Sequence, residues 1–338
     1  MKSNKYEIDM CNGSIMDKLV SFALPLMLSG ILQLMFNAVD IIVVGRFSGS
    51  EALAAVGSTT ALINVFTNLF IGISLGANVL AARFFAAGRK EEMSETVHTS
   101  ITLALISGIL MAFVGLVFSK GALELMGTPE DVIGLSTLYM RIYFMGMPFF
   151  MLYNYGAAIL RAVGDTKRPL YFLIIAGVIN AGLNMVLVIV FGLGVAGVGI
   201  ATVFSQMVSC VLVLTCLCRT EGSYKLSFSK LSMKGYYLKQ IFQVGIPAGI
   251  QSTVINFSNA LLQSSVNSFG STAMAGYTAA NNILGFLYVS INSVTQACMS
   301  FTSQNFGVGK YKRMDRVLID CMILSVGAAL VLGCGGDF

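Results

Sequence analysis

The stretch LVSFALPLMLSGILQLMFNAVDIIVVGR, from Leu19 to Arg46, contains one charged residue, Asp40, before its terminal arginine. A helix rises 1.5 Å per residue, so about twenty such residues cross the hydrocarbon core of a bilayer, which is about 30 Å thick. The whole chain is similar in character, because 56% of its 338 residues are hydrophobic, 11% are charged and its mean hydropathy is +0.80. Soluble domains carry about a quarter charged residues, so the composition predicts an integral membrane protein.

Apolar windows of sufficient length follow one another along the chain. We expect membrane-spanning helices at approximately 19–44, 52–81, 97–119, 132–158, 170–191, 196–217, 241–266, 273–302 and 317–333. Pro25, Pro148 and Pro247 fall inside three of these windows, where each would free a backbone carbonyl and favour a bend. The 35 glycines and the absence of tryptophan favour close-packed helices over a β-barrel. The predicted fold is an all-α, polytopic membrane helical bundle.

The composition also excludes several classes of site. His98 is the single histidine, so the chain has no di-histidine metal centre and no HExxH peptidase motif. The seven cysteines form no CxxC motif and most lie in apolar windows, which is typical of small buried hydrophobic residues. An integral membrane enzyme would need acids, histidines or cysteines clustered at one interface, and no such cluster is evident. We therefore expect neither an enzyme nor a bound cofactor.

The basic residues alternate between successive loops. All of the 21 lysines and arginines except Arg46, Lys120 and Arg141 fall in the N-terminal tail or in every second loop. Because cytoplasmic loops hold an excess of positive charge, this pattern predicts a multi-pass inner-membrane protein with a cytoplasmic N-terminus. Membrane topology also accounts for the net charge of +5, so we expect the lipid bilayer, and no nucleic acid, as a partner.

The chain repeats itself at an offset of 222 residues. The run SFALPLMLSGILQLMFNAVD has a counterpart in QVGIPAGIQSTVINFSNALL, which aligns Pro25 with Pro247 and Asn37 with Asn259. A polar linker from Arg219 to Gln240, with five basic residues and one acid, separates six windows from three. We predict a six-helix lobe at 1–225 and a partial lobe at 226–338. The second lobe would be incomplete, so we expect a chain truncated after nine of twelve helices.

Three charged residues lie inside the windows, at an expected cost of about 2.5 to 3.5 kcal/mol each at the bilayer centre. Asp320 comes four residues after Arg316, where we expect it to be solvated at the cytoplasmic edge. Arg141 is expected to reach the outer surface or to pair with a carboxylate. Asp40 lies six residues before Arg46, about 9 Å below the outer end of its helix.

Uncharged polar residues reach the same depth as Asp40. These are Asn184 and Thr202, with Asn180 one turn deeper on the face that it shares with Asn184. Together they supply oxygen ligands for a small cation such as Na⁺, or a pocket for a titrating proton. The alternative is that the amides and hydroxyl only join helices while Asp40 pairs with Arg141. The sequence leaves both open.

Neutral polar and aromatic residues provide a candidate substrate cavity. The position of the second unit that matches Asp40 is Leu262, so symmetric packing does not require a carboxylate. An amphipathic cavity for a bulky apolar or cationic compound would use Asn37, Met147, Phe150, Tyr153, Gln251, Asn256 and Asn259. Ordinary helix packing is the simpler explanation for any one of them.

Several segments together resemble the multidrug and toxic compound extrusion (MATE) family of cation-coupled exporters. They are PLMLSGILQLMFNAVDIIVVGRFSG from Pro25, GRKEE from Gly88, LRAVGDTKRP from Leu160, NAGLN from Asn180, GLGVAGVGIAT from Gly192 and GIPAGIQ from Gly245. The resemblance implies twelve helices in two lobes around a central cavity, a monomer, and drug efflux driven by Na⁺ or H⁺.

The resemblance also implies roles for individual residues. The family's cation site falls on Asp40, Asn180, Asn184 and Thr202. Many members have an aspartate where this chain has Asn184, and some have a glutamate where this chain has Ile255.

The function that we expect is a cation-coupled antiporter that exports amphipathic or cationic drugs by alternating access. In this hypothesis Asp40 takes up H⁺ or Na⁺ from outside, which repacks the helices around it and releases drug. One alternative is a flippase for lipid-linked oligosaccharides, which would need a basic cavity, whereas Arg141 is the only basic residue in the windows. Another is an inactive fragment of an exporter, because a rocking mechanism needs two lobes.

Overall fold

The structure is a computed structural model of the 338-residue chain, and it describes the backbone of residues 6–267 and 271–334. The helices are α1 (Ile15–Phe47), α2 (Ser50–Ala86), α3 (Lys90–Leu125), α4 (Glu130–Met145), α5 (Met147–Ala162), α6 (Lys167–Asn184), α7 (Gly194–Arg219), α8 (Gly235–Asn267), α9 (Ser271–Gly307) and α10 (Tyr311–Cys334). A π-helical turn, Met185–Val190, extends α6, and a 3₁₀ turn, Phe228–Lys230, lies in the linker before α8. Over the described residues the fold is helical throughout.

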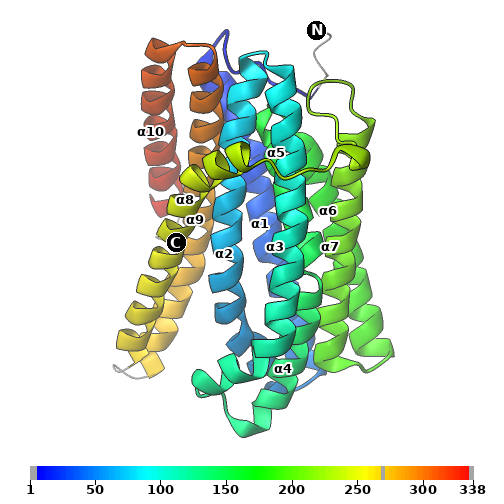
Figure 1. The fold of residues 1–338 in the computed structure, drawn as a ribbon. Helices are drawn as coiled ribbons and strands as arrows, with labels where there is room; N and C mark the ends of the chain where they lie inside the picture. The colour runs from blue at the N-terminus through cyan, green and yellow to red at the C-terminus, as the bar shows by residue number, and fades with distance from the viewer. Residues whose placement is uncertain (1–5, 268–270, 335–338) are drawn as a thin grey trace.

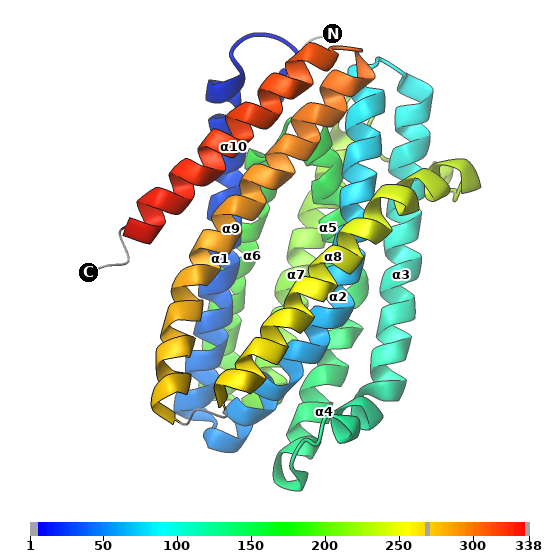
Figure 2. The same cartoon turned by 90° about the vertical axis from the view of Figure 1, so that its left-hand side faces the viewer.

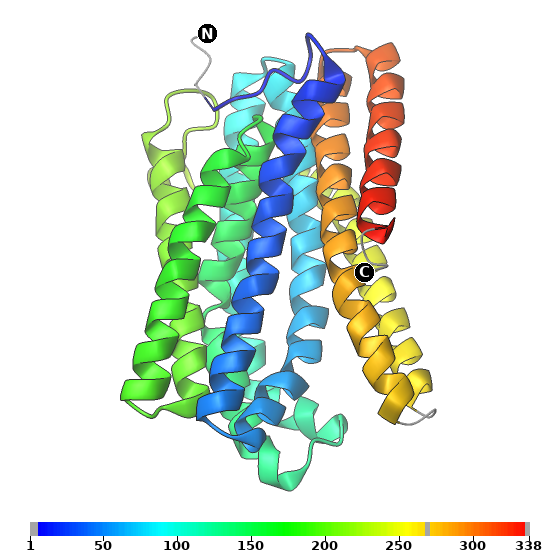
Figure 3. The same ribbon diagram turned by 180° about the vertical axis from the view of Figure 1, so that it is seen from behind.

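The helices form a bundle with a smaller group along one side. Helices α1 to α7 make the bundle, and α8, α9 and α10 pack beside it (Figure 1). Helix α8 crosses α2 obliquely, and α9 runs between α1 and α10 (Figure 2). Seen from behind, α1 lies between α6 and α9 (Figure 3). Helices α1 and α2 therefore join the two groups.

Five helices of the described chain are long and apolar enough to cross a membrane: α1, α2, α3, α6 with its extension to Val190, and α7. The remaining expected windows in the second unit coincide with α8, α9 and α10. The single span expected at 132–158 is wrong, because the helix stops at Gly146 and restarts as α5. Pro148 lies in the first turn of α5, where its missing N–H needs no intrahelical partner.

The N-terminal segment ties the two groups of helices together at one end. The Ile8 amide donates to the carbonyl of Gly164, in the turn between α5 and α6, at 3.3 Å. Two residues further on, the carbonyl of Met10 accepts a hydrogen bond from the Asn305 side chain of α9 at 3.1 Å. The Met10 side chain is fully buried with Phe22 of α1 and Phe301 of α9. The segment thus adds a second connection between the bundle and α9.

The contact between α2 and α8 depends on glycines that face each other. Gly72 and Gly76 are one turn apart in α2, and Gly245 and Gly249 are one turn apart in α8. A Cβ atom placed on Gly245 would lie 2.5 Å from the Cα of Ile73, and one on Gly72 would overlap the backbone of Gly249. Small residues at this spacing let two helix backbones approach closely in a membrane. The sequence therefore sets how near the second unit lies to the first.

We predict that Gly72→Ala destabilises the protein although alanine is the better helix former. In an open helix this change gains up to about 1 kcal/mol, but at Gly72 the new methyl group meets the Gly249 backbone and overpacking costs about 1–3 kcal/mol. The matched control is Gly57→Ala in the same helix, where a Cβ has open space around it. The thermal midpoint of the monodisperse protein in detergent should fall by several degrees for Gly72→Ala and stay level or rise for Gly57→Ala. Equal thermal midpoints for the two variants would contradict the close contact between α2 and α8 at Gly72.

Candidate functional site

Asp40 lies near the end of α1 with only 8% of its surface exposed. It accepts a hydrogen bond from the side-chain amide of Asn184 in α6, and its second oxygen lies 3.5 Å from the Thr202 hydroxyl of α7. Asn184 also donates to Asn180 Oδ1 at 3.2 Å, and Asn180 Nδ2 lies 3.5 Å from the Thr202 hydroxyl. The four residues that the sequence singled out therefore share one hydrogen-bonded network across three helices.

Local sequence explains how these side chains meet. Asn180 and Asn184 are four residues apart, so they occupy one face of α6. One turn before them, Gly177 lets the Phe36 ring of α1 lie directly against α6, because a Cβ there would overlap that ring. The close approach of α1 to α6 brings Asp40 within reach of Asn184. Glycine at 177 is thus as important to the geometry as the polar residues themselves.

The network contains oxygen atoms that lack a donor. The Thr202 hydroxyl has one proton and two acceptors within reach, the Val198 carbonyl at 3.0 Å and Asp40 Oδ2 at 3.5 Å, so it cannot donate to both at once. Asn184 Oδ1 is buried and accepts no hydrogen bond from the described part of the chain. Buried acceptors without donors are costly, so each one calls for an explanation. A cation or an added proton would satisfy these oxygens.

Asp40 forms no ion pair with the described residues, and Arg141, its expected alternative partner, is exposed on α4. The interpretation in which Arg141 neutralises Asp40 is therefore not what the structure shows. Asp320 also differs from expectation. Its residue is 8% exposed and lies 4.0 Å from Arg316, so it is buried and paired rather than solvated. Asp40 is thus a buried carboxylate held by neutral groups.

A cavity of about 340 Å³ opens beside Asp40 within the first bundle. Asp40 is the one charged residue among those that line it. Amides and aromatic rings make up much of the remaining wall, namely Gln33, Asn37, Asn64, Asn68, Asn154, Asn180, Gln206, Phe36, Tyr139, Tyr143, Phe150 and Tyr153. Such a wall suits an amphipathic guest with aromatic surface, and its single negative charge favours a cationic one.

The structure brings together part of the predicted cavity set. Asn37, Phe150 and Tyr153 line the cavity, whereas Met147 is fully buried in the core at the start of α5 and does not line it. Two residues predicted on α8 are exposed and lie outside this cavity; they are Gln251 and Asn259. The side chain of Asn256 lies outside the described residues.

Sequence reasoning missed the contribution of α2 to the cavity. Asn64 and Asn68 line it from one face of that helix. Their spacing of four residues inside an apolar window is the same signal that identified Asn180 and Asn184. Polar residues paired at this spacing were therefore informative in both helices.

A bundle of membrane-crossing helices around a polar cavity is the architecture of a membrane transporter. The chain belongs to the MatE family, whose model matches residues 25–186 and 247–334. The family consists of transporters rather than enzymes, and the chain is a multi-pass membrane protein.

Curated relatives support the same assignment. The chain is 34% identical over 306 residues to the probable multidrug resistance protein YoeA of Bacillus subtilis, covering 88% of this chain and 66% of that protein. It is 24% identical over 308 residues to an FAD transporter of Shewanella oneidensis, covering 89% and 67%. The chain thus spans about two thirds of the length of these relatives.

A solved structure described as the outward-facing conformation of a multidrug resistance MATE family transporter of the MOP superfamily has the same fold. Its TM-score is 0.88 at 24% sequence identity, over 99% of this chain and 73% of that one.

We predict that Asp40 and Asn184 are energetically coupled. Asn184→Ala removes the donor to a buried carboxylate, which should cost about 1–3 kcal/mol, whereas in an Asp40→Asn background the same change should cost clearly less. Thermal midpoints of the two single variants and the double variant in detergent measure the coupling. Asn154→Ala, which removes a cavity amide bonded only within α5, is the control and should show no coupling to Asp40. If the losses of stability in Asp40→Asn and Asn184→Ala simply add up in the double variant, the proposed coupling between the two side chains is contradicted.

Proposed function

We propose that the protein is a cation-coupled multidrug antiporter, which exports amphipathic or cationic compounds by alternating access in exchange for Na⁺ or H⁺. The observation that carries this proposal is the buried Asp40 carboxylate at the wall of a polar cavity. Behind it lies Asn184, which donates to Asp40 and whose own Oδ1 accepts no hydrogen bond from the described residues. A carboxylate in the membrane without a basic partner is a functional feature by default, because its burial is expensive.

The four residues offer a coherent ligand set for a small cation. Asp40 would supply the charge, and the Asn184 carbonyl and Thr202 hydroxyl would supply neutral oxygens, with Asn180 holding Asn184 in place. Hard oxygen ligands of this kind suit Na⁺. A proton on Asp40 would neutralise the same charge, so either ion fits the arrangement. No cofactor beyond the coupling ion is proposed.

Exchange of drug for ion is expected because a single carboxylate, Asp40, attracts both of them. A cationic drug in the cavity and an ion on Asp40 would both be attracted to the same carboxylate. An ion that neutralises Asp40 lowers the affinity of the cavity for the drug, and by thermodynamic reciprocity the drug lowers the affinity for the ion. Ion entry from outside would therefore release the drug there. The helices that contact Asp40 are the parts that respond to its charge.

We further propose that residues 1–225 and 226–338 are the moving units, in a protein that works as a monomer. The family model matches twice, and the matches begin at Pro25 and Pro247, the two prolines aligned by the internal repeat. The glycines let the backbones of α2 and α8 approach closely at the boundary between the two units, and we place the tilt at this contact. An alternating-access mechanism would use such a tilt to open the cavity to either side.

The cavity supports drug export over lipid-linked oligosaccharide flipping. A pyrophosphate-bearing lipid would need arginine or lysine in its site, and the described cavity is lined by neither. The same argument disfavours a strongly anionic nucleotide as substrate here, although one relative is called an FAD transporter. We therefore place the substrate class among amphipathic compounds that are neutral or positively charged.

Asp40→Asn should abolish drug efflux, because the variant keeps the shape of the side chain but cannot bind a cation through a charge. The test uses cells that lack their own exporters and express the complete reading frame, with dye efflux followed while the Na⁺ or H⁺ gradient is collapsed in turn. Asp320→Asn, which changes a second carboxylate buried to the same extent, is the matched control and should retain efflux. Full efflux and drug resistance with Asp40→Asn would refute the proposal. The gradient whose collapse stops dye efflux by the wild-type protein identifies the coupling ion.

The N-terminus is proposed to face the cytoplasm of an inner-membrane protein. In a cysteine-free background, Lys120→Cys in α3 and Lys312→Cys near the start of α10 should fall on opposite sides. A membrane-impermeant maleimide applied to spheroplasts should label the Lys120→Cys variant at once, and the Lys312→Cys variant only after lysis. The reverse pattern would invert the topology and the direction of transport.

A further inference from the structure

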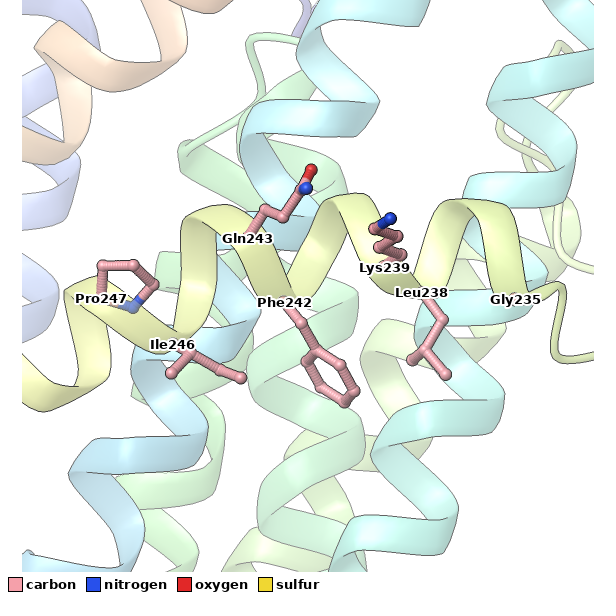
Figure 4. A pocket seen from close by; sticks show the side chains of 7 residues that line it. All are labelled: Gly235, Leu238, Lys239, Phe242, Gln243, Ile246 and Pro247. Carbon is pink, nitrogen blue, oxygen red and sulfur yellow. The ribbon is translucent and has the colours of Figure 1, made fainter.

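The first three turns of α8 form a groove that the proposed transport site does not use. Its volume is about 500 Å³, and it is lined by Gly235, Leu238, Lys239, Phe242, Gln243, Ile246 and Pro247. The side chains of Leu238, Phe242 and Ile246 lie on one side of the helix, whereas those of Lys239 and Gln243 lie on the other (Figure 4). The apolar residues are four apart, so they make a continuous strip about 12 Å long.

The start of α8, which carries this groove, lies toward the end of the bundle where the N-terminal segment and the linker are found (Figures 1 and 2). Lys234, just before α8, pairs with Glu95 of α3 at 3.2 Å, and its amide donates to the Thr99 hydroxyl at 3.4 Å. These contacts hold the start of α8 against the first turns of α3. Tyr236 is 69% exposed beside the groove, as expected for an aromatic residue at the surface of a membrane.

Lys239 gives the groove a positive charge that the protein does not neutralise. It is exposed, and it takes part in none of the ion pairs that the described residues form. The linker that leads into α8 has Glu221 as its single acid against five basic residues. With Lys239 on one side of α8 and the apolar strip on the other, the start of the helix is complementary to a molecule whose anionic head lies on the Lys239 side and whose hydrocarbon tail lies on the side of the strip.

The apolar strip is partly open: Leu238 and Phe242 are half-buried against the core of the first bundle, whereas Ile246 is exposed. The matching face of α1 is also open. At the repeat offset of 222 residues, Phe242 and Ile246 correspond to Val20 and Leu24 of α1, which are 43% and 52% exposed in the presence of all the helices of the first bundle. Lys239 corresponds to Asp17, so the charge at this position is opposite in the two units. The positive groove is therefore particular to α8.

We propose that this groove binds an anionic glycerophospholipid of the membrane leaflet at this end of the bundle. An acyl chain lies along Leu238, Phe242 and Ile246, and Lys239 holds the phosphate group. Lipids with a neutral head group gain the apolar contact alone, so the site selects by charge. A lipid held here rests against the helix whose glycines contact α2, which places it at the boundary between the two units.

The absence of tryptophan from the chain makes a direct test available. Phe242→Trp introduces the single tryptophan of the chain into the groove, where it can be excited selectively over the tyrosines, and the variant is reconstituted into phosphatidylcholine vesicles that contain phosphatidylglycerol. Bromine atoms are placed on the acyl chains of one lipid or the other, and quenching reports which lipid occupies the groove. We expect phosphatidylglycerol to be preferred about fivefold, which is the effect of one lysine near an anionic head group.

Two controls separate a site from general contact with lipid. Lys239→Gln added to Phe242→Trp should reduce the preference to about one, whereas Lys312→Gln, the same charge change near the start of α10, should leave it intact. Val20→Trp probes the matching face of α1, where Asp17 replaces the lysine, and should show no preference for phosphatidylglycerol. If Phe242→Trp does not fold, Ile246→Trp, one turn along the groove, is used as the fluorescent probe instead.

Equal quenching by the two brominated lipids would overturn the proposal and leave only non-specific contact with the bilayer. A preference that survives Lys239→Gln would do the same, because the charge would then come from elsewhere. Quenching requires no transport, so this result stands apart from the outcome of the Asp40→Asn efflux test.

Discussion

Asp40 places a carboxylate in the membrane-crossing part of α1 with no basic partner among the described residues, and much of the structure can be understood from that constraint. An unpaired charge in a bilayer is expensive, so the surrounding helices must supply polar groups at its depth. Asn184 and Thr202 do so from α6 and α7, and Gly177 allows the close approach of helices that the contact requires. The same network leaves Asn184 Oδ1 without a donor among the described residues, which is the feature on which the proposed cation site rests.

A second constraint acts between the two groups of helices. Lipid offers no hydrophobic drive for helices to associate, so α2 and α8 depend on close backbone contact at four glycines. Beyond the glycines, the Phe84 ring of α2 packs edge-on against the Tyr237 ring of α8, so side chains also hold this contact at the start of α8. The N-terminal segment connects the same two groups at one end, through the buried Met10 and the hydrogen bond from Ile8 to the turn before α6.

The reach of sequence reasoning differed between features. Composition and window length identified the membrane helices, and Pro148 indicated a bend in the window 132–158. Hydropathy averages over a window, so it did not predict that the helix ends at Gly146 and restarts as α5. Spacing of four residues grouped Asn180 with Asn184 correctly, and the same rule would have found Asn64 and Asn68. Met147 was predicted to line the cavity with Phe150 and Tyr153, yet it is fully buried in the core, since the direction of a side chain depends on how its helix is rotated in the bundle.

The sequence by itself determined that this chain lies in a membrane as a set of apolar helices, that it repeats after 222 residues and that Asp40 is the charge most in need of an explanation. These properties are local, because they depend on residue type and spacing along one helix. Only the tertiary structure decided which residues satisfy Asp40, that Arg141 does not, and which side chains enclose the cavity. Those outcomes depend on how helices rotate and cross, which is set by contacts such as Gly72 with Gly249 between residues distant in the chain.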